Sequence, residues 1–225
     1  MSKIEAYIFD LDGVVVDTAR YHYLAWKRLA AELGYVFAEE DNEQFKGVSR
    51  MECMDILAAM TGRDFEVEEK NKLADRKNDW YIEYIRNMHK DEVVPGFVEF
   101  IAEIRKAGGK TALASASKNA ALVLEKLELS QYFDQVVDGN DVQKSKPDPQ
   151  VFLLAAERLK VEEQKCLVFE DAQAGIDAAK SANMLAVGIG KPEILLKGAD
   201  IMKPGFDGLK LYQLLQELKI AEVAV

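Results

Sequence analysis

Short apolar runs alternate with longer amphipathic segments over most of the chain. The runs have the length of strands, and they cover residues 4–9, 110–114, 166–169 and 184–189. The segments between them are long enough for helices. This alternation predicts βαβ units and an α/β fold with a parallel sheet buried on both faces.

Residues 16–92 break this pattern, because they contain no convincing strand and read as helices. Helices are expected over residues 18–33, 50–61 and 66–88. Gly34 and Gly62 directly follow the first two, and glycine is common just past a helix end. We therefore predict a helical cap, residues 16–92, inserted into a core formed by residues 1–15 and 93–225. A last amphipathic helix, residues 208–218, is expected to pack on the core.

Composition narrows the classes of function. The chain has 225 residues, of which 49% are hydrophobic and 30% charged, as in globular proteins. A net charge of -10 argues against bulk electrostatic binding to nucleic acid or to an anionic membrane. No apolar run approaches the roughly 18 residues that span a bilayer, and no secretion signal is recognisable. Cys53 and Cys166 fit no disulfide or zinc pattern, so a cytoplasmic protein is expected.

Polar side chains follow three of the predicted strands. They are Asp10 and Asp12 after the first, Ser115, Ser117 and Lys118 after the second, and Glu170 and Asp171 after the third. The carboxyl ends of parallel strands meet at one sheet edge, where ligands bind. Carboxylates crowded there repel one another unless a cation joins them, and Mg²⁺ prefers such oxygen ligands. Beside Mg²⁺, one aspartate can attack phosphorus and a second can move a proton.

The segment Asp-Leu-Asp-Gly-Val-Val-Val-Asp-Thr at residues 10–18 resembles the signature of the haloacid dehalogenase superfamily. Further motifs of that superfamily follow in order: Ser115, Lys146 before Pro147, and the Glu170-Asp171 pair. The resemblance implies a Rossmann-like parallel-sheet core with an inserted, mobile, all-helical cap.

Within the superfamily the chain resembles the β-phosphoglucomutases, most strongly in residues 10–14, 42–50, 76–79 and 112–119. The resemblance implies that Asp10 is the nucleophile and that Asp12 is the general acid/base. It implies that Ser115 and Lys146 hold the transferring phosphoryl group. It also implies a Mg²⁺ site made by Asp10, Asp12 (through its carbonyl), Glu170 and Asp171.

The same resemblance implies a substrate site shared by cap and core. Its residues are His22, Trp26, Lys46, Gly47, Val48, Ser49, Arg50, Lys77, Ala116, Ser117, Lys118 and Asn119. From the residues alone, His22 is compatible with packing, Lys77 with an ammonium that reaches solvent, and Arg50 with a solvated surface. Cys53 stands where the family pattern suggests serine, and residues 138–141 are more polar than expected.

The resemblance implies an isomerase that interconverts β-glucose 1-phosphate and glucose 6-phosphate through phospho-Asp10 and glucose 1,6-bisphosphate. A Mg²⁺-dependent sugar-phosphate phosphatase is the alternative, and a non-catalytic sugar-phosphate sensor is a third. The expected partners are small sugar phosphates, and a monomer is expected. The sugar, its anomer and the balance between mutase and phosphatase stay open.

Overall fold

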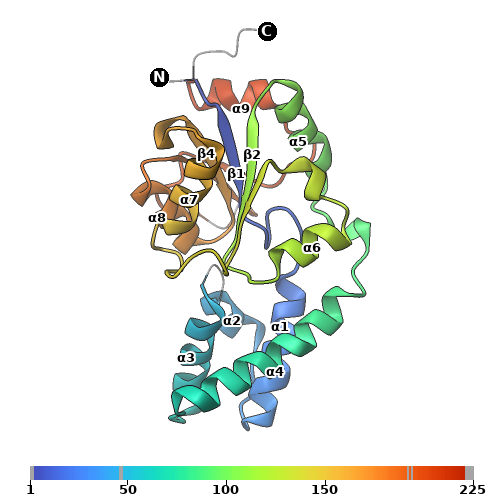
Figure 1. Ribbon diagram of the computed structural model, residues 1–225, viewed down its shortest axis with the longest axis vertical. Helices are drawn as coiled ribbons and strands as arrows, with labels where there is room; N and C mark the ends of the chain where they lie inside the picture. Colours follow the sequence, from blue (N-terminus) through green and yellow to red (C-terminus); the bar gives the residue numbers. More distant parts are fainter. Residues whose placement is uncertain (1–2, 46–47, 192, 194, 221–225) are drawn as a thin grey trace.

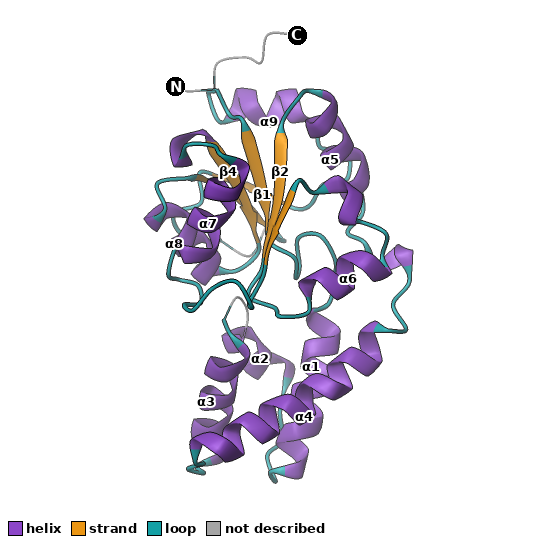
Figure 2. Cartoon of the chain, in the orientation of Figure 1, coloured by secondary structure: helices purple, strands orange, loops and turns teal. Residues whose placement is uncertain are grey.

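A parallel sheet of six strands forms the centre of the molecule in the computed structural model, which describes residues 3–45, 48–191, 193 and 195–220 (Figures 1 and 2). Its strand order is β3-β2-β1-β4-β5-β6. The strands are β1 (Ala6–Phe9), β2 (Lys110–Ala114), β3 (Gln135–Val137), β4 (Cys166–Glu170), β5 (Leu185–Ile189) and β6 (Ile201–Lys203). The α/β prediction is confirmed, and the four expected strands are β1, β2, β4 and β5. The short edge strands β3 and β6 were not predicted.

Alternate residues of β1 serve opposite faces of the sheet. Tyr7 and Phe9 pack with the apolar sides of α5 (Phe97–Lys106), α6 (Ala120–Lys126) and α9 (Leu211–Glu217). Ala6 and Ile8 pack with α7 (Gln150–Leu159) and α8 (Gln173–Ser181). Figure 2 shows these helices flanking the sheet. Both faces are therefore covered, which explains why the strands read as continuous apolar runs.

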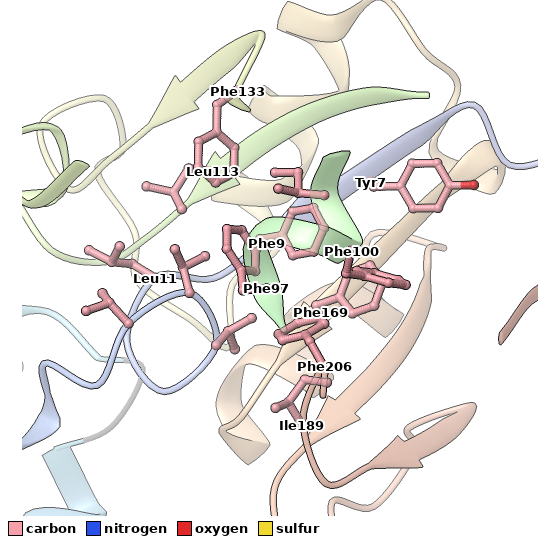
Figure 3. Packing of buried hydrophobic residues seen from close by; sticks show 14 of the residues in the cluster. Tyr7, Phe9, Leu11, Phe97, Phe100, Leu113, Phe133, Phe169, Ile189 and Phe206 are labelled. Atoms are coloured by element: carbon pink, nitrogen blue, oxygen red, sulfur yellow. The ribbon is translucent and has the colours of Figure 1, made fainter. Parts of the chain in front are cut away.

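Aromatic rings fix the carboxyl ends of the two central strands. The ring of Phe9 stacks on Phe169 with centroids 4.6 Å apart, and it meets Phe97 edge-on at 5.4 Å. Figure 3 shows these rings gathered with Phe100 and Phe206. Because Asp10 and Glu170 continue from Phe9 and Phe169, this packing fixes the backbone from which both carboxylates project.

The segment predicted as a cap is helical. It contains α1 (Ala19–Glu32), α2 (Glu39–Asn42), α3 (Arg50–Thr61) and α4 (Val67–Ile85), which lie together at one end of the molecule (Figure 1). Helices α1, α3 and α4 share a hydrophobic cluster of their own, which includes Trp26, Leu57 and Leu73. The C-terminal part of α4, however, packs with the core cluster through Tyr81 and Ile85. The boundaries of a separate cap domain stay a prediction.

The two chain crossings between the helical segment and the sheet run side by side. Val16 and Val93 form an antiparallel bridge, and Val94 N donates to Val15 O at 3.0 Å. Asp17 N donates to Glu92 O at 3.2 Å. The crossings therefore form one two-stranded link.

Short 3₁₀ helices complete the described fold. They cover Glu43–Phe45, Lys90–Glu92, Ser130–Tyr132 and Glu163–Lys165. Within the described ranges, no helix has both the length and the apolar character required to cross a membrane.

Candidate active site

A cavity of about 370 Å³ lies at the carboxyl edge of the sheet, between the sheet and helices α1, α3 and α4. Most of the predicted site residues line it: Asp10, Asp12, His22, Trp26, Val48, Ser49, Arg50, Lys77, Ala116, Ser117, Lys118, Asn119, Lys146 and Asp171. Lys46 and Gly47 lie outside the described residues. Segments that are distant in the sequence thus meet at the carboxyl edge of the sheet, where the residues that follow the predicted strands were expected.

Ser115 and Glu170 are placed behind the cavity wall, and both are fully buried. Ser115 Oγ accepts a hydrogen bond from Ser117 N at 3.0 Å. Its hydroxyl therefore also closes the turn that leads from β2 toward α6. Glu170 ends β4, and it contacts two residues that line the cavity: its Oε2 accepts from Lys146 Nζ and its Oε1 accepts from Asp171 N at 3.2 Å.

Lys146 connects two carboxylates in the interior. Its Nζ donates to Asp10 Oδ1 at 2.5 Å and to Glu170 Oε2 at 2.8 Å, and its side chain is 1% exposed. Burial acts to lower the pKa of Lys146, but the two carboxylates together raise it above its ordinary value. Lys146 is therefore a permanent cation beside Asp10.

Oxygen atoms of Asp10, Glu170 and Asp171 lie within 4.8 Å of one another, a spacing that suits one metal ion. Three carboxylates face the single ammonium of Lys146, which leaves an excess of negative charge that a divalent cation would offset. All three ligand atoms are hard oxygens, as Mg²⁺ prefers. The residues therefore fit Mg²⁺.

Two glycines make room for these carboxylates. A Cβ at Gly13 would lie 2.2 Å from Asp171 Oδ2, and a Cβ at Gly175 would lie 2.0 Å from the Glu170 carboxyl carbon. Gly13 also has a φ of 79°, which favours glycine. At both positions the backbone lies so close to the acidic cluster that a side chain would clash with a carboxylate.

Asp12 has the environment of a proton donor. Burial and the neighbouring Asp10 carboxylate raise its pKa to about 8. Its Oδ1 is buried and has no hydrogen-bond partner in the described part of the chain, with His22 Nε2 3.9 Å away. These surroundings favour the protonated form of the Asp12 carboxyl group.

His22 and Lys77 form a pair in the cavity wall. Lys77 Nζ lies 2.9 Å from His22 Nδ1 and 4.6 Å from the centre of the Trp26 ring. Burial lowers the pKa of Lys77 to about 7 and holds that of His22 well below its usual range. Because an ammonium only donates, charged Lys77 requires Nδ1 to accept, which puts the imidazole proton on Nε2, facing Asp12.

Arg50 is tied to the opposite side of the cavity through Asn78. Arg50 Nη2 and Asn119 Nδ2 each donate to Asn78 Oδ1 at 2.8 Å. The hydroxyl of Ser49 accepts from Glu52 N at 3.3 Å and caps α3, so it has a structural task beside its predicted binding role.

Asn78 was not among the predicted site residues. The available signal was its place beside Lys77 in residues 76–79, one of the segments on which the family resemblance rests. Cys53, the departure from the family pattern, is buried, lines the cavity and has its Sγ 3.6 Å from Phe45 O.

The sequence profile of haloacid dehalogenase-like hydrolases matches residues 4–183. The chain belongs to this family. A β-phosphoglucomutase from Bacillus subtilis is 40% identical over 201 residues, which cover 88% of each chain. A phosphorylated carbohydrates phosphatase from Thermotoga maritima is 34% identical over 184 residues, which cover 80% of this chain and 82% of the relative.

The crystal structure of a β-phosphoglucomutase from Clostridium difficile superposes with a TM-score of 0.92 at 40% identity, over 96% of this chain and 97% of that one. The predicted family and the Rossmann-like fold with helices inserted after the first strand are thereby confirmed. The relatives include both mutases and phosphatases, so sequence similarity alone does not separate the two activities, and the geometry of the site is needed.

Proposed function

We propose that the protein interconverts β-glucose 1-phosphate and glucose 6-phosphate, with phospho-Asp10 and glucose 1,6-bisphosphate as intermediates. The proposal rests on a single cavity that is lined by two separate groups of side chains able to bind or transfer phosphate. One group, on the sheet edge, is Asp10 with Lys146. The other combines Arg50 with Lys118 and Asn119. A mutase needs both, because its intermediate carries two phosphates.

Phosphoryl transfer begins at Asp10. A carboxylate oxygen of Asp10 attacks phosphorus, the bond from phosphorus to the sugar oxygen breaks, and the sugar oxygen takes a proton from Asp12. Lys146 orients Asp10 through Oδ1 and balances charge on the phosphoryl oxygens. In the return direction Asp12 removes the proton of the accepting sugar hydroxyl. The raised pKa of Asp12 suits both directions.

Asp10, Glu170 and Asp171, with the carbonyl of Asp12, would hold Mg²⁺. The ion would screen the Asp10 carboxylate from the negatively charged phosphate that it attacks.

A Mg²⁺-dependent sugar-phosphate phosphatase is the second candidate, and the similarity to the Thermotoga maritima phosphatase favours it. It shares the chemistry of Asp10 but uses water as the acceptor. The features that favour the mutase are on the helical side of the cavity, where Lys77, His22 and Arg50 enclose the acceptor site. Enclosure disfavours water and protects the aspartyl-phosphate.

We further propose that small sugar phosphates are the only substrates, that the enzyme is a monomer, and that it works in the cytoplasm. The two buried free cysteines are compatible with a reducing compartment. Size-exclusion chromatography with light scattering tests the monomer, since a dimer would give twice the mass.

The substrate proposal is tested with the separate α- and β-anomers of glucose 1-phosphate. Purified protein with Mg²⁺ and a trace of glucose 1,6-bisphosphate is coupled to glucose-6-phosphate dehydrogenase. NADPH should form from the β-anomer alone. Turnover of the α-anomer at an equal rate would contradict the proposal.

A further inference from the structure

The Asn78 carboxamide occupies a position between two donors that belong to different parts of the fold. Arg50 begins α3 in the helical segment, whereas Asn119 precedes α6 beside the sheet. Both donate to the same acceptor, Asn78 Oδ1, at 2.8 Å. One oxygen atom on α4 thus brings together side chains from three separate elements.

The two hydrogen bonds to Asn78 use only some of the N–H groups of Arg50 and Asn119. A guanidinium carries five N–H groups and a carboxamide nitrogen carries two. Asn78 Oδ1 accepts one hydrogen bond from Arg50 and one from Asn119, so the remaining N–H groups of both side chains can donate to phosphate oxygens. Asn78 can therefore hold both donors in position while they bind phosphate.

Without Asn78, Arg50 would have a different preferred partner. Its other contact is Asp75, with Nη1 and Oδ1 3.5 Å apart, and the Asp75 side chain is 78% exposed. An exposed pair at that distance contributes little. It would nevertheless draw the guanidinium toward solvent and away from Asn119. The Asn78 contact opposes that movement.

We propose that Asn78 is the positioning residue that assembles the second phosphate site, by aligning Arg50 with Asn119 across the cavity. The inference rests on the proposed function, which assigns Arg50 and Asn119 to that phosphate. The Asn78–Asn119 bond forms only when α4 lies against the loop after β2.

The test is a double-mutant cycle of Asn78→Ala and Arg50→Ala, with KM for β-glucose 1-phosphate as the readout. Asn78→Ala should raise KM about 10-fold, the loss expected from one to two hydrogen bonds to a charged group. Phosphorylation of Asp10 by acetyl phosphate, which does not occupy the second site, should stay within about 2-fold. In the Arg50→Ala background, Asn78→Ala should add less than about 2-fold.

Asn87→Ala is the matched control, because Asn87 is exposed just beyond α4 and its side-chain Nδ2 donates to the backbone carbonyl of Glu83. It should leave KM unchanged. An unchanged KM in Asn78→Ala, or a full additional 10-fold loss in the Arg50→Ala background, would overturn the positioning role. If Arg50→Ala itself left KM unchanged, the second phosphate site of the proposed function would fail instead.

Asn78→Asp keeps the test decisive if the alanine variant is unstable. It retains an acceptor oxygen, so the melting temperature should remain near that of the parent protein. Its negative charge would neutralise Arg50 and repel the substrate phosphate, so KM should rise at least 10-fold. A KM equal to that of the parent protein would show that Asn78 does not face the phosphate site.

Discussion

Two buried lysines in the same cavity have opposite electrostatic surroundings. Lys146 lies between Asp10 and Glu170, which raise its pKa. Lys77 has His22 and the Trp26 ring as neighbours, and burial lowers its pKa to about 7. Lys146 therefore keeps its charge at every physiological pH, whereas Lys77 changes charge near neutrality. The cavity therefore has a fixed cation beside Asp10 and a titratable one near Asp12.

The lowered pKa of Lys77 implies a stability cost that depends on pH. The unfolded chain, with an ordinary lysine pKa of 10.5, binds this proton between pH 7 and pH 10.5, whereas the folded protein does not. The free energy of unfolding therefore rises with pH across that window, and the full cost is present below pH 7. Lys77→Met should stabilise the protein by roughly 1–3 kcal/mol at pH 7, with little difference left near pH 10.5.

Urea unfolding at several pH values measures this difference. Lys72→Met, on the exposed side of the same helix with its side chain 73% exposed, is the control and should change stability little at any pH. If the stabilisation by Lys77→Met did not vary with pH, the lowered pKa of Lys77 would be wrong.

Among the secondary-structure elements, the longer strands could be predicted from the sequence and the shortest strands could not. The strands β1, β2, β4 and β5 have at least four residues with clear apolar character. The edge strands β3 and β6 have only three residues each, too few for a periodicity, and their pairing with β2 and β5 is what defines them. The two strands that the sequence pattern missed are therefore defined by tertiary contacts.

The same distinction, between sequence pattern and tertiary contact, applies to the site residues. Residues directly after strands could be placed together, because parallel strands end at one edge. Asn78 could not, because its role depends on which way a helix face points. Lys77 and Asn78 are adjacent on α4, so their side chains diverge by about 100°. Lys77 meets His22, and Asn78 meets Arg50.

The polar segment 138–141, a departure from the family pattern, is explained by a closed turn. Asp138 N donates to Asp141 Oδ2 at 3.0 Å, and Arg158 Nη2 pairs with Asp141 Oδ1 at 2.5 Å. These side chains hold the loop after β3 against α7, and Gly139 of that loop lines the cavity. The polar side chains of this segment therefore hold a loop that forms part of the cavity wall.

Helix α8 offers a test of how Glu170, a proposed Mg²⁺ ligand, is supported. Alanine in place of Gly175 would improve helix propensity by about 1 kcal/mol, but its Cβ would lie 2.0 Å from the Glu170 carboxyl carbon. The displaced Glu170 should lower the free energy of unfolding by about 2 kcal/mol and weaken Mg²⁺-dependent activity at least about 10-fold.

Gly205→Ala is the control for that substitution, since a Cβ at Gly205 meets nothing within 4 Å. Chemical unfolding and a Mg²⁺ titration of activity give the two readouts. A Gly175→Ala variant as stable and as active as Gly205→Ala would show that Glu170 does not depend on this close approach.

In the whole molecule, a net charge of -10 coexists with a cavity that we propose binds sugar phosphates. Acidic groups collect at the sheet edge, and the cations Arg50, Lys77, Lys118 and Lys146 line the same cavity. Mg²⁺ would offset the excess negative charge of the acidic cluster. The protein therefore presents a local positive site while its overall charge disfavours polyanions.

Binding of Mg²⁺ should stabilise the folded protein, because the ligands converge only in the native state. Addition of Mg²⁺ at 100 times its dissociation constant should increase the free energy of unfolding by about 2.7 kcal/mol. Thermal unfolding with Mg²⁺ or with EDTA measures the shift, and Asp171→Asn should reduce it. An equal shift in the Asp171→Asn variant would place the ion elsewhere.

In the proposed reaction, phospho-Asp10 transfers its phosphoryl group to a sugar rather than to water. ³¹P NMR of the protein with Mg²⁺, β-glucose 1-phosphate and a trace of glucose 1,6-bisphosphate follows both outcomes in one sample. We expect glucose 6-phosphate to accumulate in large excess over inorganic phosphate. Release of inorganic phosphate as the main product would make the protein a phosphatase, and the absence of both products would leave only a sugar-phosphate sensor.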